Sequence, residues 1–238
     1  MNMKLLDEQI QSIKKELQRL KDIEAVRKLE NAYGFYLIHF MNREIIDCFS
    51  DRADTTVVFP EGTFFGKEGV ERAFGTTNKN MDPEFMHQMM QLSGVIDIET
   101  DGKTAKGRWW GFGAMAIPSG EEISMGEKSE GVKQSLACGV YENEFIKEGE
   151  VWKIWKFKWV PLYSCIPEHG WVKPERLSKQ ALETGGTKNP DWWKPDIPSG
   201  GKDYAYPSGY ILPFHYKHPV TENETSERLR NVSFEENE

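Results

Sequence analysis

Two long stretches of alternating residues in the middle of the chain constrain the fold most, because each contains its own reversal. The first runs over residues 86–117 and turns at Asp101-Gly102. An Asp-Gly pair readily supplies the positive φ angles that a tight hairpin turn needs. The second runs over residues 134–164 and turns at 147–150, with strict alternation after the turn. Both stretches therefore predict long antiparallel hairpins.

Helical patterns precede these hairpins. An amphipathic helix over residues 3–21 is indicated by apolar residues at alternating spacings of four and three: Leu6, Ile10, Ile13, Leu17 and Leu20. The phase changes at Ile23, and a second, tyrosine-rich helix is expected up to Asn42. The first pattern is too short for a freestanding coiled coil. We therefore expect it to pack on its own subunit or on a neighbouring one.

A strand and a short helix are expected between the two regions. The β-branched run Thr55–Phe59 predicts a strand that Pro60 ends, and residues 66–74 predict a short helix. Helices that come before a run of antiparallel strands favour an α+β domain over a parallel α/β sheet.

The rest of the chain divides by composition. A polar, glycine-rich excursion over residues 118–133 is placed to cover a pocket mouth. Residues 161–220 combine proline and glycine with many aromatic residues, so we expect an extended arm held against folded protein. Residues 221–238 predict a charged, frayed tail. The expected division is a helix over 1–21, a domain over 22–160, the arm and the tail.

Composition excludes several classes of function. The net charge of −8 argues against nucleic acid as a partner, because binding to phosphates needs a positive surface. No segment is apolar enough to cross a bilayer and the N-terminus does not resemble a secretory signal, so no membrane association and a cytoplasmic location are expected. Cys48, Cys138 and Cys165 are far apart and predict reduced thiols.

The order of these elements resembles that of SnoaL-like proteins of the nuclear transport factor 2-like superfamily. The family pattern combines a tyrosine on the N-terminal helix, a phenylalanine before an acidic turn, a G-x-x-G-x-E motif, a histidine and two hairpins. In this chain its positions are Tyr33, Phe49, Gly66, Gly69, His87, Gly102, Ala105, Gly149 and Trp152. The resemblance covers about residues 22–160.

This resemblance implies a curved antiparallel sheet wrapped around N-terminal helices, forming a cone with an internal cavity. Characterised relatives include scytalone dehydratase, bile-acid 7α-dehydratase, ketosteroid isomerase, polyketide cyclases and the γ-formaldehyde lyases of lignin-derived diaryl compounds. These proteins use no cofactor and form dimers or trimers. For this chain the resemblance implies a small-molecule substrate, no cofactor and a homo-oligomer.

His87 is the expected general acid or base, because it matches the family histidine and imidazole titrates near neutrality. Tyr33 matches the helix tyrosine whose phenol can donate to a developing oxyanion. A hydrogen-bonded structural histidine and a core tyrosine are the respective alternatives. Relatives usually carry an aspartate where this chain has Ile38, so their mechanisms cannot be copied. Glu61 and Glu142 are the candidates to replace it, although each is by default a solvated carboxylate.

Further candidates surround these residues. Arg108, the third expected catalytic residue, would hold a phenolate or carboxylate if it faces the cavity. The expected substrate-binding residues are Tyr36, His39, Glu61, Trp110, Tyr141, Tyr210 and His215. For His39, a surface or capping residue is the favoured alternative. His215 and His218 have no third ligand at a convincing spacing, so no metal site is expected.

These residues together predict a cofactor-free acid/base lyase that acts on a hydrophobic, aromatic and hydroxylated molecule. The missing carboxylate at Ile38 and the aromatic arm favour the formaldehyde-lyase type over a dehydratase. An isomerase or cyclase on the same cavity, and a non-catalytic small-molecule binding protein, are the alternatives.

Overall fold

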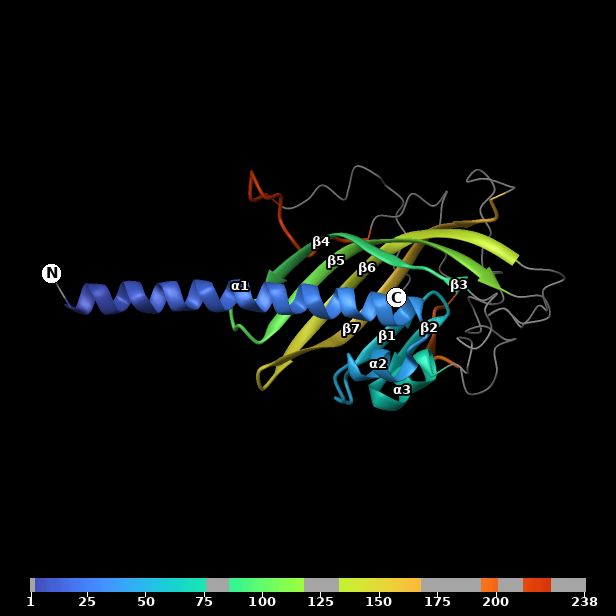
Figure 1. Ribbon diagram of the computed structural model, residues 1–238, viewed down its shortest axis with the longest axis horizontal. Coiled ribbons are helices and arrows are strands. Elements are labelled where there is room, and N and C mark those ends of the chain that lie inside the picture. Colours follow the sequence, from blue (N-terminus) through green and yellow to red (C-terminus); the bar gives the residue numbers. More distant parts are fainter. Residues whose placement is uncertain (1–2, 76–85, 118–132, 168–193, 201–211, 224–238) are drawn as a thin grey trace.

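The computed structural model describes residues 3–75, 86–117, 133–167, 194–200 and 212–223. Within these ranges a single long helix lies across a curled sheet, and two short helices pack beside it (Figure 1). Residues 118–132 of the expected excursion over 118–133, the last residues of the chain and most of the expected arm lie outside the described residues.

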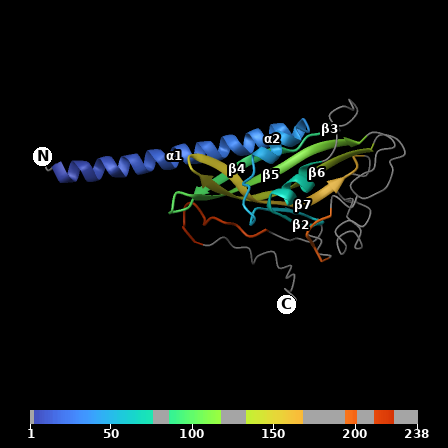
Figure 2. The same ribbon diagram turned by 90° about the horizontal axis from the view of Figure 1, so that it is seen from below.

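The helix α1 (Met3–Ile38) replaces the two helices that were expected. The change of phase at Ile23 is real, but it marks the point where the helix meets the sheet and not a break in the helix. Every residue from 3 to 21 is exposed, and Asp22 is the first buried one. Figures 1 and 2 both show the N-terminal part of α1 extending beyond the sheet.

The short elements after α1 follow the sequence closely. The helix α2 (Asn42–Asp47) leads to strand β1 (Thr56–Phe59), which ends before Pro60 as expected, and α3 (Gly66–Phe74) is the predicted short helix. Strand β2 (Gly62–Phe65) was not expected. It pairs with β1 across a two-residue turn.

Both predicted hairpins are confirmed. Strands β4 (Met90–Ile98) and β5 (Thr104–Ile117) meet at the Asp101-Gly102 turn, where Gly102 has a φ of 65°. Asp101 also accepts backbone N–H hydrogen bonds from Lys103 and Thr104, at 2.7 and 3.1 Å, which fixes the turn. Strands β6 (Lys133–Glu148) and β7 (Val151–Cys165) form the second hairpin around Gly149.

The described strands form one sheet in the order β3-β5-β6-β7-β1-β2-β8, with β4 also paired to β5. Strands β3 (Met86–His87) and β8 (Ile197–Pro198) are short and lie at its edges. All pairs are antiparallel except β1 with β7. The predicted α+β architecture, a curled sheet around N-terminal helices, is therefore confirmed.

The core lies between the concave face of the sheet and the three helices. Its centre is a group of aromatic rings in edge-to-face and tilted contact, with centroids 5.3–6.4 Å apart: Tyr33, Phe49, Phe59, Phe64, Phe74 and Phe157. Such contacts stabilise a core beyond the burial of area alone. We call the side of the sheet that faces this core its inner face.

None of the helices in the described part of the chain combines the length and apolar character needed to cross a lipid bilayer. Of the three cysteines, all free thiols, Cys48 and Cys165 are buried and Cys138 is half-buried.

Candidate functional site

One stripe of α1 supplies the helix side of the interior. Its buried residues recur every three or four positions, which places them on one side of a helix: Asp22, Val26, Glu30, Tyr33 and Leu37. Two of the five are acids, and Asp22 lies at the edge of the core, where Lys147 and Trp152 donate to its carboxylate. The other is Glu30, a carboxylic acid with no solvent exposure.

Glu30 is held by Asn143, which is also fully buried and projects from β6. The Asn143 amide nitrogen donates to both carboxyl oxygens of Glu30, at 3.1 and 3.2 Å. The Asn143 side-chain oxygen in turn accepts the backbone N–H of Lys158, at 3.1 Å. Burial raises the pKa of Glu30 to about 8, and the hydrogen bond from Asn143 offsets only part of this effect. Glu30 therefore holds its proton at neutral pH.

Two tyrosines lie next to this acid. Tyr33 and Tyr141 are almost fully buried, and the ring of Phe157 lies 5.4 Å from each of their ring centroids. Burial raises the pKa of both phenols, and electrostatic interactions with Glu30 raise them further. Both tyrosines are therefore neutral hydrogen-bond donors in a water-poor interior. The structure brings these two predicted residues together with an acid that the sequence analysis missed.

The side-chain amide of Gln91 is a further polar group beside these tyrosines. Gln91 on β4 pairs with Gly111 on β5, and its side chain lies beside the Tyr141 hydroxyl and against Gly34 of α1. The Gln91 amide nitrogen is buried and has no hydrogen-bond partner of standard geometry among the described residues. Buried donors without partners are rare in native proteins. The Gln91 side chain nevertheless interacts with Tyr141, where its hydrogen bond opposes part of the rise in the phenol pKa that burial causes.

Tryptophan rings lie flat over glycines on the inner face. A Cβ atom on Gly111 would come within 2.3 Å of the Trp159 ring, and one on Gly139 within 2.5 Å. The Trp109 ring occupies the corresponding space over Gly107. The absence of side chains at these positions lets two large rings pack against the inner face of the sheet.

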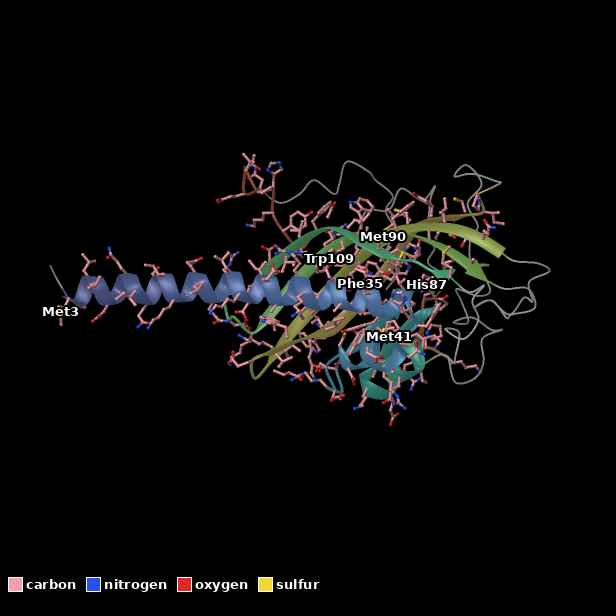
Figure 3. All side chains as sticks on the ribbon, viewed as in Figure 1. Met3, Phe35, Met41, His87, Met90 and Trp109 are labelled. Atoms are coloured by element: carbon pink, nitrogen blue, oxygen red, sulfur yellow. The ribbon has the colours of Figure 1, made fainter. Side chains whose placement is uncertain are left out.

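His87 lies further along the same face. It pairs with Met115 of β5, so its side chain shares the face of the sheet that carries Trp109 and Gly111. Its ring is half-buried and stacks on Phe40, just beyond the end of α1, with centroids 5.8 Å apart. Figure 3 shows His87 near that end of the helix, beyond Phe35.

His87 and the group formed by Glu30, Tyr33 and Tyr141 lie at different positions along α1. Tyr33 and Phe40 are seven positions apart, which corresponds to about 10 Å along a helix axis. His87, next to Phe40, therefore lies well away from the group formed by Glu30 and the tyrosines. One small reacting centre does not contact both groups.

Arg108 lies on the opposite, outer face of the sheet. Its guanidinium donates to Glu142 at 3.1 Å and to the carbonyl oxygens of Pro213 and Leu212 at 2.9 and 3.0 Å. It also lies over the ring of Phe214, 4.2 Å from the centroid. The described part of the C-terminal arm is thus fastened to the sheet by Arg108.

His215 completes this attachment and is likewise outside the core. Its Nδ1 contacts the Glu142 carboxylate, and its Nε2 lies 3.5 Å from Asp97. Only 5% of the His215 side chain is exposed. Beside it runs an open groove of about 330 Å³ whose lining includes Glu142, Lys158 and Leu212. Arg108 and His215 meet at Glu142, and both are separated from Tyr33 and Tyr141 by the sheet.

The remaining predicted residues are scattered. Tyr36 packs against the core from α1, whereas His39 is exposed just after the end of that helix. Glu61 occupies the turn between β1 and β2, where burial raises the pKa of its carboxyl. Trp110 faces outward and is 49% exposed. Tyr210 lies outside the described residues.

The sequence contained a signal for Glu30 that was overlooked. Val26, Glu30, Tyr33 and Leu37 follow one helical face, so an acid stands where an apolar residue is expected. Asn143 carries no comparable signal, because alternation along a strand does not reveal which polar residue faces inward. Across the described ranges, no three His, Cys, Asp or Glu side chains come together in a way that would hold a metal ion.

Comparisons with known proteins agree with this architecture. No curated protein sequence matches the chain significantly. A candidate scytalone dehydratase from Novosphingobium aromaticivorans superposes with a TM-score of 0.50 at 13% identity, over 68% of this chain and 97% of that protein. The hexachlorocyclohexane dehydrochlorinase LinA-type3 from Novosphingobium barchaimii gives 0.47 at 19% identity, over 67% and 99%.

The sequence itself carries a family match. The profile of the SnoaL-like domain matches residues 18–158, which spans the helix stripe, the aromatic core and both hairpins. This range contains Glu30, Tyr33, His87 and Tyr141, and it excludes the attached arm residues. The chain therefore belongs to the SnoaL-like domain family.

Proposed function

We propose that the protein is a cofactor-independent enzyme that performs acid/base chemistry on a hydrophobic small molecule at the inner face of its sheet. The observation that carries the proposal is the set of neutral proton donors around Glu30. A carboxyl group with a pKa of about 8 and two buried phenols share a water-poor interior. Perturbed titratable groups of this kind gather at active sites more often than elsewhere.

His87 is proposed as the group that exchanges a proton with the substrate, since it is a half-buried imidazole on the same face. Tyr33 and Tyr141 are proposed to donate hydrogen bonds to a negatively charged oxygen at the far end of the substrate. Glu30 is proposed to supply a proton, because its carboxyl group remains protonated at neutral pH. Arg108 is not part of this proposal, because its guanidinium is engaged on the outer face.

The favoured reaction is an elimination on an aromatic, hydroxylated substrate. For a 1,2-diarylpropane-1,3-diol, His87 takes the proton of the primary hydroxyl, and the adjacent carbon-carbon bond breaks as formaldehyde leaves. The electron pair of that bond forms the new double bond, and the benzylic hydroxyl leaves as water after it is protonated. The products are a stilbene, formaldehyde and water. The roughly 10 Å between His87 and the tyrosines along the helix suits a two-ring substrate.

The test is to incubate the purified protein with such a diol and to measure the release of formaldehyde and the absorbance of the stilbene. His87→Gln should lower kcat by about 10²- to 10⁴-fold and leave substrate affinity nearly unchanged. His218→Gln is the matched control, because His218 lies in the described arm and its ring accepts only local backbone hydrogen bonds.

Four results decide between the possibilities. Turnover that depends on His87 supports the proposal. Release of neither formaldehyde nor stilbene removes the lyase assignment, and full activity of His87→Gln removes the catalytic role of the histidine. Tight binding of the diol by a wild-type protein that turns nothing over would identify a binding protein instead.

A further inference from the structure

The N-terminal part of α1 presents an apolar seam to solvent. Six large apolar residues, which are between 38% and 78% exposed, recur at alternating spacings of three and four: Met3, Leu6, Ile10, Ile13, Leu17 and Leu20. We call these six residues the N-terminal seam. Their spacing is the a/d pattern of a two-helix contact. No side chain in the described ranges covers them.

The seam points away from the folded body. With about 3.6 residues per turn, the mean direction of the seam lies roughly 170° around α1 from that of the buried stripe. The exposed Phe35 continues the seam direction along the part of α1 that rests on the sheet. The sheet and the seam therefore lie on opposite sides of one helix, so a helix docked on the seam meets no part of the sheet.

The helix also needs support that its own body does not give. Residues 3–21 span about 28 Å and make no buried contact within the described part of the chain. A helix of this length is marginal in water without tertiary packing. Its apolar seam is the surface on which such packing is available.

Charges beside the seam make it self-complementary. The positions that flank an a/d pattern carry two acids and two bases: Asp7, Glu16, Lys14 and Lys21. Opposite charges meet across two copies of the helix in either orientation. In a parallel pair Glu16 of one copy lies near Lys21 of the other, and in an antiparallel pair Asp7 lies near Lys14. The flanks therefore cancel in charge, although the whole chain carries −8.

We infer that the N-terminal seam is a docking surface for the same seam of a second copy of this chain. The two helices pack along Met3 to Leu20, and the two sheets lie on opposite outer sides of the helix pair. The contact is formed by a part of α1 that makes no contribution to the interior. It is independent of the proposed catalytic function.

Light scattering and sedimentation velocity on the full-length protein test this inference. Ile13→Lys/Leu17→Lys places two charges in the seam and should halve the molar mass of the wild-type protein. It should also reduce helical circular dichroism, while the tryptophan fluorescence spectrum stays unchanged because the body remains folded. The matched control is Gln11→Lys/Ser12→Lys, which adds the same charge on the side of the helix away from the seam and should keep the wild-type mass.

Two results would overturn the inference. One is a seam variant with the molar mass of the wild-type protein, whatever that mass is. The other is a control variant whose mass falls as much as that of the seam variant, because the loss would then follow from charge alone.

Discussion

Glu30 and Asn143 are 113 positions apart in the sequence, yet the amide of one donates to both carboxyl oxygens of the other in a fully buried contact. This pair joins α1 to strand β6 of the sheet. It keeps an acid in an interior that would otherwise be apolar, and it determines how the stability of the protein depends on pH.

Stability should fall as the pH rises through the pKa of Glu30. Because burial raises this pKa from 4.5 to about 8, the folded state binds a proton that the unfolded state has lost between these values. The contribution is complete below pH 4.5 and is lost as the pH passes about 8. In Glu30→Gln this slope should be absent, and the variant should be the more stable protein at pH 9, by an amount on the order of a few kcal/mol.

Urea unfolding of both proteins between pH 5 and 9 measures the effect. Glu24→Gln, an exposed acid on the same helix, serves as the control and should keep the wild-type slope. Parallel pH profiles of wild type and Glu30→Gln would contradict the prediction.

Asp22→Asn should destabilise the fold by about 2–3 kcal/mol at neutral pH. The Asp22 carboxylate accepts from Trp152 Nε1 at 2.9 Å, Lys147 at 3.0 Å and Gln18 at 3.1 Å. Burial opposes its ionisation, but these hydrogen bonds outweigh burial and lower its pKa below 3.8. The stabilisation is therefore present above that pH and is lost as the pH falls through the lowered value.

Unfolding followed by tryptophan fluorescence reports this change directly, since Trp152 is one of the donors. The difference between wild type and Asp22→Asn should shrink towards pH 2. Glu8→Gln, on the exposed part of α1 and on the side away from the N-terminal seam, should leave stability unchanged at every pH. A loss of stability that is the same at pH 7 and pH 2 would count against the proposed cause.

Gly111→Ala should cost about 1–3 kcal/mol of folding free energy, because the new methyl group overlaps the Trp159 ring and the edge of Tyr141. Chemical denaturation measures the loss. Trp159→Phe removes the larger ring, so Gly111→Ala/Trp159→Phe should be more stable than the sum of the two single changes predicts. Simple additivity would show that the methyl group is accommodated elsewhere.

Glu142→Gln should loosen the described arm, because Arg108 and His215 both lose their shared carboxylate. Cleavage by chymotrypsin after Phe214 or Tyr216 should become about tenfold faster, which corresponds to roughly 1.4 kcal/mol. Glu150→Gln, a change at a carboxylate that is 93% exposed, is the control. Equal cleavage rates in the two variants would show that Glu142 does not hold the arm.

Local signals in the sequence were sufficient for most of the fold. The Asp101-Gly102 turn, the alternation after Gly149 and the strand before Pro60 all depend on residues close in sequence, and the structure confirms them. The continuity of α1 was missed, because a change of hydrophobic phase at Ile23 looks the same whether the helix ends or only its surroundings change.

The candidate site was less accessible to such reasoning. Which side of β5 faces inward depends on how the sheet curls, and this put Arg108 outside and Trp109 inside. The contact of Glu30 with Asn143 is a long-range one, so neither residue identifies the other from sequence. Tyr33 and Tyr141 were selected individually, and only the fold shows that they adjoin the same acid.

The continuity of α1 has a consequence for how the sequence of this protein can evolve. Positions 3–20 never enter the interior, and Glu30 and Tyr33 never reach the seam, although one helix carries both sets. Substitutions that alter self-association are thereby uncoupled from those that alter chemistry. During evolution, self-association and substrate choice can therefore change independently, through substitutions in different parts of the same helix.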